Sequence, residues 1–329
     1  MAKRRRKKKR VGALGVILSL LLTLMLSALA AAGMYYYGSS RPAPDSLRTG
    51  GAAEGTSVSL FVPSQPEENA APEAAQSLSP EIESYDPFDL DEILVQEDGI
   101  TIARVTGKLY TGFLTIVEDP LRVTLGRCPA FGEGRYGRTV EQMAQEYGAI
   151  LAVNGGGFSD PNGVGTGGQP TGNVVYNGQL LMGYWSPTVG MDAQGKLYAG
   201  DFGGDKCLQL GLQWAVSYGP TLLENGEVRQ GLDNNSQEPR TAVGQREDGS
   251  VVLVNIQGRQ ASALGVTCRQ LAYIMSDLGC VDAGNLDGGA SSDMYYRGEF
   301  LNIANTSGGP RPLPTAVMVM PAGNEEAEG

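Results

Sequence analysis

The stretch NLDGGASS, Asn285 to Ser292, follows a short apolar segment that begins at Cys280, and the rest of the chain is organised around it. The apolar segment predicts a buried strand, and the periodic apolar residues from Val266 to Leu278 predict a helix that leads into it. Asp287 therefore stands at the end of a strand, before two glycines that permit close backbone approach and two hydroxyls. This pattern is typical of a functional site. The alternative is a tight turn whose Asp and Ser satisfy local backbone groups.

Two further stretches share this design. NGGGF, Asn154 to Phe158, follows a predicted strand at Ala149–Val153, and RTAVG, Arg240 to Gly244, opens another strand with a cation and the hydroxyl of Thr241. Because each polar group stands at or beside a strand end, we expect them to converge with Asp287 on one cleft.

Together the three stretches resemble the phosphodiester glycosidase family over roughly residues 101 to 320, most specifically at Asn285–Ser292. Many members of that family have a third glycine where this chain has Ala290. The resemblance implies a hydrolase acting on a sugar-1-phosphodiester. It also implies a second site arginine at Arg311, just before the last predicted strand.

The N-terminal segment predicts a membrane anchor. Eight of the first ten residues are Lys or Arg, and the 23 residues from Val11 to Gly33 carry no charge, which is enough to cross a bilayer. Three tyrosines, Tyr35–Tyr37, stand at the expected interface. We expect residues 1–10 to be a basic cytoplasmic tail and residues 11–37 an uncleaved transmembrane signal anchor in the cell membrane. A cleaved signal peptide, with small residues at Ala28–Ala32, is the alternative.

The remaining chain divides by composition. Residues 38–85, rich in Pro, Ser, Ala, Glu and Gly, predict a disordered linker; residues 86–322 form the expected phosphodiester glycosidase-like domain, and residues 323–329 an acidic tail. Eight of the 25 cations lie before residue 11, which leaves 17 against 36 acids and a net charge of −19. This balance argues against a nucleic-acid partner. The expected partners are a glycan phosphodiester and, through the N-terminal helix, a membrane.

Within the domain, short β-branched segments separated by turn residues predict many strands. Asn177-Gly178 and Asn225-Gly226 are hairpin turns, and the capping boxes that begin at Thr139 and Thr267 start two helices. We therefore predict an α+β fold: a mixed, largely antiparallel sheet with two main helices.

The chain contains no histidine, which excludes Ser-His-Asp and Cys-His hydrolases and His-ligated zinc. The four cysteines lack zinc-ligand spacing; they allow three disulfide pairings, with Cys268–Cys280 closest in sequence, or free buried thiols. Acid–base chemistry therefore falls mainly to carboxylates. No cofactor is certain. A divalent cation such as calcium suits the oxygen ligands around Asp287, but the sequence supplies no ligand set.

We predict Asp287, Asn154 and Arg240 as catalytic residues. The predicted substrate-binding residues contribute hydroxyls, cations or close backbone: Thr241, Gly288, Gly289, Ser291, Ser292, Arg259 and Arg311. Arg240, Thr241 and Arg311 are expected on the phosphate side. Ser291 and Ser292 are expected to position the sugar, and Asn154 either holds sugar hydroxyls with them or orients Asp287. Four acids are equal candidates for a second catalytic carboxylate: Asp160, Asp201, Asp282 and Asp293.

The predicted function is extracytoplasmic hydrolysis of the sugar–phosphate bond in a cell-surface or exopolysaccharide glycan. Two alternatives remain at this point. One is a carbohydrate-binding module that uses the same cleft without turnover. The other is a transferase acting in polysaccharide assembly.

The predicted topology is testable on intact cells. Because the cations precede the apolar segment, the domain should lie outside and the N-terminus inside. Protease added to intact cells should release a soluble fragment cut within residues 38–85, as followed by immunoblotting. Protection of the domain until the membrane is permeabilised contradicts this topology.

Overall fold

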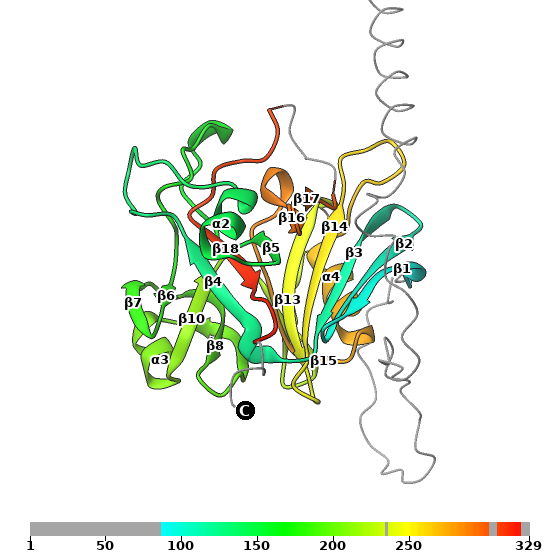
Figure 1. Cartoon of the computed structure of the whole chain (residues 1–329), viewed down its shortest axis with the longest axis horizontal. Helices are drawn as coiled ribbons and strands as arrows, with labels where there is room; N and C mark the ends of the chain where they lie inside the picture. The colour runs from blue at the N-terminus through cyan, green and yellow to red at the C-terminus, as the bar shows by residue number, and fades with distance from the viewer. Residues whose placement is uncertain (1–86, 234–235, 303–307, 324–329) are drawn as a thin grey trace, which may run out of the picture. The chain divides into compact units, whose positions relative to one another are not determined.

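The computed structural model describes residues 87–233, 236–302 and 308–323 (Figure 1). The predicted basic tail, membrane anchor and linker lie outside the described residues, as does the acidic tail from residue 324. In the described part of the chain, no helix is both long and apolar enough to cross a bilayer.

The strands form three sheets, and every ladder between two named strands is antiparallel. The expectation of one mixed sheet is therefore wrong, whereas the expected antiparallel character is confirmed. The largest sheet has the order β1-β2-β3-β14-β13-β15-β11-β12. Its strands are β1 (Asp89–Glu97), β2 (Ile100–Gly107), β3 (Tyr110–Val117), β11 (Thr221–Glu224), β12 (Glu227–Val228), β13 (Arg240–Arg246), β14 (Val251–Gln257) and β15 (Cys280–Asn285).

The two smaller sheets have five strands each, in the orders β7-β6-β10-β8-β9 and β17-β16-β5-β18-β4. The first contains β6 (Val174–Tyr176), β7 (Gln179–Met182), β8 (Ser186–Asp192), β9 (Leu197–Phe202) and β10 (Leu212–Ser217). The second contains β4 (Val123–Arg127), β5 (Leu151–Asn154), β16 (Met294–Tyr296), β17 (Glu299–Phe300) and β18 (Thr315–Val319).

Each sheet packs one α-helix against its own apolar cluster. The expected helices are α2 (Val140–Tyr147) and α4 (Cys268–Asp277); α3 (Gly204–Gln209), a third one, was not predicted. Six residues are too few to show a helical period in sequence. Three short 3-10 turns, η2 (Pro120–Arg122), η3 (Pro161–Gly163) and η4 (Gly289–Ser291), complete the described helical elements.

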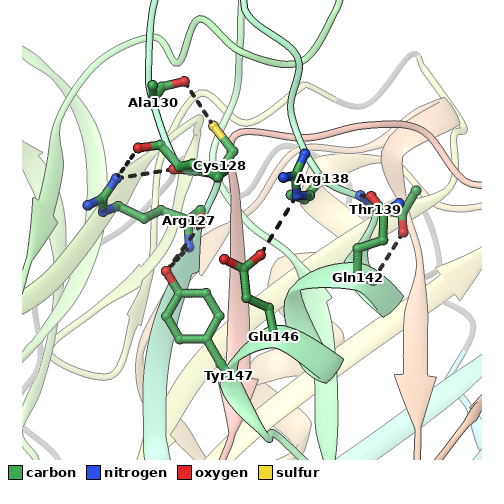
Figure 2. A network of polar contacts seen from close by, with 9 residues as sticks. Arg127, Cys128, Ala130, Arg138, Thr139, Gln142, Glu146 and Tyr147 are labelled. Atoms are coloured by element: carbon green, nitrogen blue, oxygen red, sulfur yellow. Dashed lines mark hydrogen bonds and ion pairs between the residues drawn. The ribbon is translucent and has the colours of Figure 1, made fainter.

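Both predicted capping boxes are present. At α2, Thr139 Oγ1 accepts from the Gln142 amide at 3.2 Å, and the Thr139 amide donates to Gln142 Oε1 at 3.0 Å (Figure 2). The same two bonds join Thr267 and Gln270 at α4. Such caps satisfy amides that the first helical turn leaves free, so they determine where each helix begins. These two helices lead the chain into β5 and β15, the strands that carry Asn154 and the Asp287 stretch.

The central strands are buried on both faces. Along β14, Val252, Val254 and Ile256 belong to the cluster around α4, while the residues between them face the opposite way and are equally buried. The largest sheet thus has a helix on one face and other strands on its second face; Val189 of β8, for example, packs against Gly284 of β15. All four cysteines are buried and free, so the fold is held by this packing and not by disulfides.

Candidate active site

A cleft of about 550 Å³ opens where the Asp287 stretch meets the loops after β5 and before β13. Seven of the residues predicted for substrate binding or catalysis line it: Asp287, Gly288, Gly289, Ser291, Arg240, Arg259 and Arg311. The remaining lining residues are Phe158, Asp160, Gly163, Tyr218, Ser236, Glu238 and Ala290. The expected convergence of three distant stretches therefore takes place.

Asn154 and Thr241 lie beneath the cleft and do not line it. The Asn154 amide donates to the Asp287 carbonyl at 2.5 Å, and its oxygen accepts from Thr241 Oγ1 at 2.7 Å and from the Asp293 amide at 3.2 Å. Both side chains are fully buried and engaged with the protein. They position the Asp287 loop, which is the second of the two roles expected for Asn154, whereas Thr241 was expected to contact the phosphate. Ser292 is also buried and absent from the lining.

Asp287 is 8% exposed at the base of the cleft. Burial raises the pKa of this carboxyl to about 6, against the opposing effects of hydrogen bonds from Ser291 and the Gly288 amide and of the Arg311 charge. Tyr218 also hydrogen-bonds the carboxyl, and burial followed by the Asp287 charge raises the pKa of the Tyr218 hydroxyl. At neutral pH Asp287 is thus an ionised carboxylate poised close to its protonation point.

Two arginine–carboxylate pairs line the cleft. Arg311 Nη2 lies 2.8 Å from Asp160 Oδ1, and its guanidinium stacks 5.1 Å from the centre of the Phe158 ring. Arg259 Nε lies 2.7 Å from Glu238 Oε2. Each guanidinium has further N–H donors beyond those that face its carboxylate, and this set suits an anionic oxygen in the cleft.

Arg240 is held differently. Its Nε donates to the Val266 carbonyl at 3.3 Å and its Nη2 to the Ser236 carbonyl at 3.1 Å, and the residue is 9% exposed. Backbone carbonyls, unlike a carboxylate, do not neutralise the guanidinium. Among the described residues no carboxylate forms an ion pair with Arg240, so its positive charge is free to attract an anion in a largely desolvated part of the cleft.

The glycines of the Asp287 stretch allow this crowding. Gly289 has φ = +60°, and a Cβ there would stand 2.8 Å from Arg259 Nη2. Ala290, where a third glycine is common in the family that the sequence resembles, follows inside η4 and is not among the residues with positive φ. The alanine methyl is thus accommodated without backbone strain.

Asp160 is the only one of the four candidate second carboxylates that lines the cleft in the described part of the chain. Asp201 pairs with Arg229, and Asp282 accepts from the Asn225 amide. Asp293, 1% exposed, hydrogen-bonds Asn302 beneath the cleft, and burial raises the pKa of its carboxyl to about 6.

Sequence reasoning missed five residues of the lining: Phe158, Gly163, Tyr218, Ser236 and Glu238. Glu238 stands two residues before Arg240, and Phe158 ends the NGGGF stretch, so adjacency to the predicted motifs was an available signal for both. Tyr218 follows β10, a strand that adjoins none of the predicted motifs in sequence, so no such signal pointed to it. Within the described residues no group of three or more His, Cys, Asp or Glu side chains is placed to hold a metal ion.

Comparison with known proteins agrees with this geometry. The family model for phosphodiester glycosidase matches residues 147–320, which contain all the strand-end stretches of the site. The chain belongs to the phosphodiester glycosidase family. The resemblance seen in the sequence is thereby confirmed.

Two known proteins are similar to this chain in sequence over part of their length. The SPbeta prophage-derived uncharacterized protein YomE of Bacillus subtilis (strain 168) is 29% identical over 173 residues, covering 50% of this chain and 27% of YomE. The N-acetylglucosamine-1-phosphodiester alpha-N-acetylglucosaminidase of Mus musculus is 26% identical over 250 residues, covering 68% of this chain and 47% of the mouse protein. The chain thus spans less than half the length of these relatives.

A solved structure shares the fold. The zebrafish N-acetylglucosamine-1-phosphodiester alpha-N-acetylglucosaminidase catalytic domain, auto-inhibited by its pro-peptide, superposes with a TM-score of 0.55 at 24% identity. The match covers 71% of this chain and 87% of the zebrafish chain. The overall fold is therefore shared with this solved structure.

The raised pKa of Asp287 predicts a pH-dependent cost to stability. An exposed aspartate titrates near 4, so the folded protein binds more protons than the unfolded chain between about pH 4 and 6, and stability falls as pH rises through that window. Asp287→Asn removes the buried charge but keeps the acceptor for the Gly288 amide. It should raise Tm by several degrees at pH 7.5, as measured by calorimetry, and by almost nothing at pH 4.

Asp160→Asn is the matched control for that measurement. Its hydrogen bond with Arg311 lowers the pKa of the Asp160 carboxyl, so the sign is opposite and no gain at pH 7.5 is expected. An equal Tm for wild type and Asp287→Asn at pH 7.5 contradicts the burial cost assigned to Asp287.

Proposed function

We propose that this domain hydrolyses the bond between the anomeric carbon and the phosphate oxygen of a sugar-1-phosphodiester. The observation that carries the proposal is the placement of Asp287, buried and with a pKa of about 6, in one cleft with three arginines. Membership of the phosphodiester glycosidase family and the names of the mouse and zebrafish relatives support it.

The chemistry follows from the leaving group. A phosphate monoester departs without being protonated, so the site mainly has to stabilise negative charge on its oxygens. Arg240, Arg259 and Arg311 supply donors for that charge from different parts of the cleft. A phosphodiester entering there competes with Asp160 and Glu238 for the guanidinium donors. Arg240 faces no competing carboxylate in its described contacts and is our choice for the strongest phosphate contact.

Asp287 acts in its ionised form, as the general base for water or as the nucleophile. In the first case the water oxygen bonds to the anomeric carbon while its proton passes to Asp287. The bond between that carbon and the phosphate oxygen breaks, and its electron pair stays on the phosphate. The products are the free sugar and a phosphomonoester. Ser291 and Tyr218, both hydrogen-bonded to Asp287, orient the carboxylate.

For the wider context we propose an enzyme anchored in the cell membrane by residues 11–37, with its domain outside and a cell-surface or exopolysaccharide glycan as substrate. The basic residues before the apolar segment support this orientation. The acidic balance of the remaining chain disfavours a nucleic-acid substrate.

The kinetic prediction concerns the role of Asp287. On a diester of N-acetylglucosamine-1-phosphate, kcat/KM should fall about tenfold per pH unit below pH 6, because protonation removes the base or nucleophile. Asp287→Asn should lower kcat by roughly a hundredfold or more with little change in KM, since the arginines still bind phosphate. Arg240→Ala should lower kcat and raise KM.

Asp293→Asn is the matched control, because Asp293 has a similar pKa but lies beneath the cleft. This variant should keep the acid limb of the pH profile.

Activity that rises as the pH falls through 6 assigns Asp287 as an acid and contradicts its proposed role. Release of no free sugar from any diester in a panel favours a binding module, and sugar transfer to an added glycan in place of water favours a transferase.

A second prediction identifies the bond that breaks. Hydrolysis in ¹⁸O-water should place the label in the sugar, because water attacks the anomeric carbon, as measured by mass spectrometry of both products. Label found in the phosphate shows attack at phosphorus, and the enzyme is then a phosphodiesterase and not a glycosidase.

A further inference from the structure

Two neighbouring aromatic side chains, Tyr184 and Trp185, stand in solvent with exposed fractions of 61% and 78%. The whole chain has two tryptophans, and the other, Trp214, is 3% exposed with its Nε1 donating to the Val123 carbonyl at 3.1 Å. Adjacent large aromatic residues left in water are a feature of surfaces that bind something.

The segment that carries them is firmly held. It crosses from β7 to β8, and the Tyr184 amide donates to Asn173 Oδ1 at 2.9 Å. Asn173 is fully buried, and its Nδ2 donates to Thr188 Oγ1 and to the Phe202 carbonyl, both at 2.8 Å. A backbone anchored by a satisfied buried amide presents its side chains without a large ordering cost on binding.

This segment adjoins the cleft through Tyr218. Thr188 of β8 pairs with Ser217 of β10, the residue before Tyr218, and Pro187 packs within 2.7 Å of where a Cβ on Gly219 would stand. Tyr218 itself is 44% exposed, lines the cleft and hydrogen-bonds Asp287. Tyr218 therefore follows β10, and Tyr184 and Trp185 precede β8, its paired neighbour in the sheet; of the three, Tyr218 lines the cleft. We call these three residues the aromatic strip.

We propose that the aromatic strip binds neutral pyranose rings of the glycan chain that continues beyond the bond cleaved. This inference rests on the proposed function for the identity of that chain. The electron-rich face of an aromatic ring suits the C–H face of a sugar ring, and Tyr and Trp offer large contact areas at low conformational cost.

The charge around the strip distinguishes sugars from an anionic membrane. Residues 183–190 and 214–223, which contain the strip and its supporting strands, include no Lys, Arg, Asp or Glu. Binding to anionic lipid typically adds basic residues to the aromatic ones. The neighbouring elements β9 and α3 carry Asp201, Asp205 and Lys206, which are acidic on balance. Segments without charge beside such a balance disfavour anionic lipid and suit the neutral rings on either side of a phosphodiester in a glycan.

The test uses the emission of Trp185 in the full chain, since Trp214 is buried and insensitive to solvent. The probes are chitohexaose, cellohexaose and maltohexaose, which are neutral and carry no phosphate. At least one should shift the emission to the blue and protect it from acrylamide quenching, both saturably. Tyr184→Ala should weaken that binding by about tenfold, and Trp185→Ala, followed by calorimetry, should abolish it.

Leu121→Ala is the matched control. Leu121 is also an exposed apolar residue, at 64%, but it packs beside Gly195, in the turn after β8, at the end of that strand opposite to Trp185. This variant should bind the hexasaccharide like wild type. Asp287→Asn should also bind the hexasaccharide unchanged, although it fails to hydrolyse a sugar-1-phosphodiester. This variant separates failure of the present inference from failure of the proposed reaction.

Two results overturn the inference. One is the absence of any emission change with all three hexasaccharides at millimolar concentration. The other is a blue shift with vesicles of phosphatidylglycerol and phosphatidylethanolamine but with none of the sugars, which assigns the strip to a membrane surface. Equal Tm values for the variants and wild type establish that the strip residues act locally.

Discussion

The buried side chain of Asn154 is the contact on which the site depends. One amide joins β5, β13 and the Asp287 stretch, because its nitrogen donates to the Asp287 carbonyl and its oxygen accepts from Thr241 and the Asp293 amide. In an interior from which water is excluded, leaving any of these groups unpaired is costly, so the three segments keep one relative position. Buried hydrogen bonds below the cleft thus fix the position of the Asp287 loop.

Above this contact, the cleft holds the Asp287 carboxylate, whose charged form is destabilised by burial, and three arginines, two of which are paired with carboxylates. Asp287 is ionised in a poorly solvated position, and its raised pKa measures that cost. Arg311 and Arg259 each face a carboxylate, which limits the repulsion among three cations in a small volume. Such a site gives up stability for reactivity, a recurring feature of active sites. An entering phosphate exchanges one anionic partner of the arginines for another and leaves the charge balance of the cleft little changed.

Much of the local structure could be predicted because short-range chemistry determines it. Both capping boxes mark true helix starts, and the Asn-Gly pairs at Asn177 and Asn225 are hairpin turns. The short helix α3 was missed because six residues are too few to show a helical period. The separation into three sheets was missed because the sequence of a single strand does not reveal which strand it pairs with. In the site, the Asp287 stretch and its arginines were predicted. Asn154 was expected either to hold the sugar or to orient Asp287, and Thr241 to contact the phosphate; both instead lie beneath the cleft and support the loop.

The sequence by itself determined the family, the absence of histidine chemistry, the strand-end position of Asp287 and the presence of Gly289, which leaves room for Arg259. These features depend on residue type and on neighbours a few positions apart. Only the tertiary structure decided that Asp160 and Glu238 face the arginines, that Tyr218 reaches Asp287, and that Trp185 is exposed while Trp214 is buried. Those facts depend on how three sheets pack. Distances between side chains far apart in sequence follow from that packing, and no local pattern contains them.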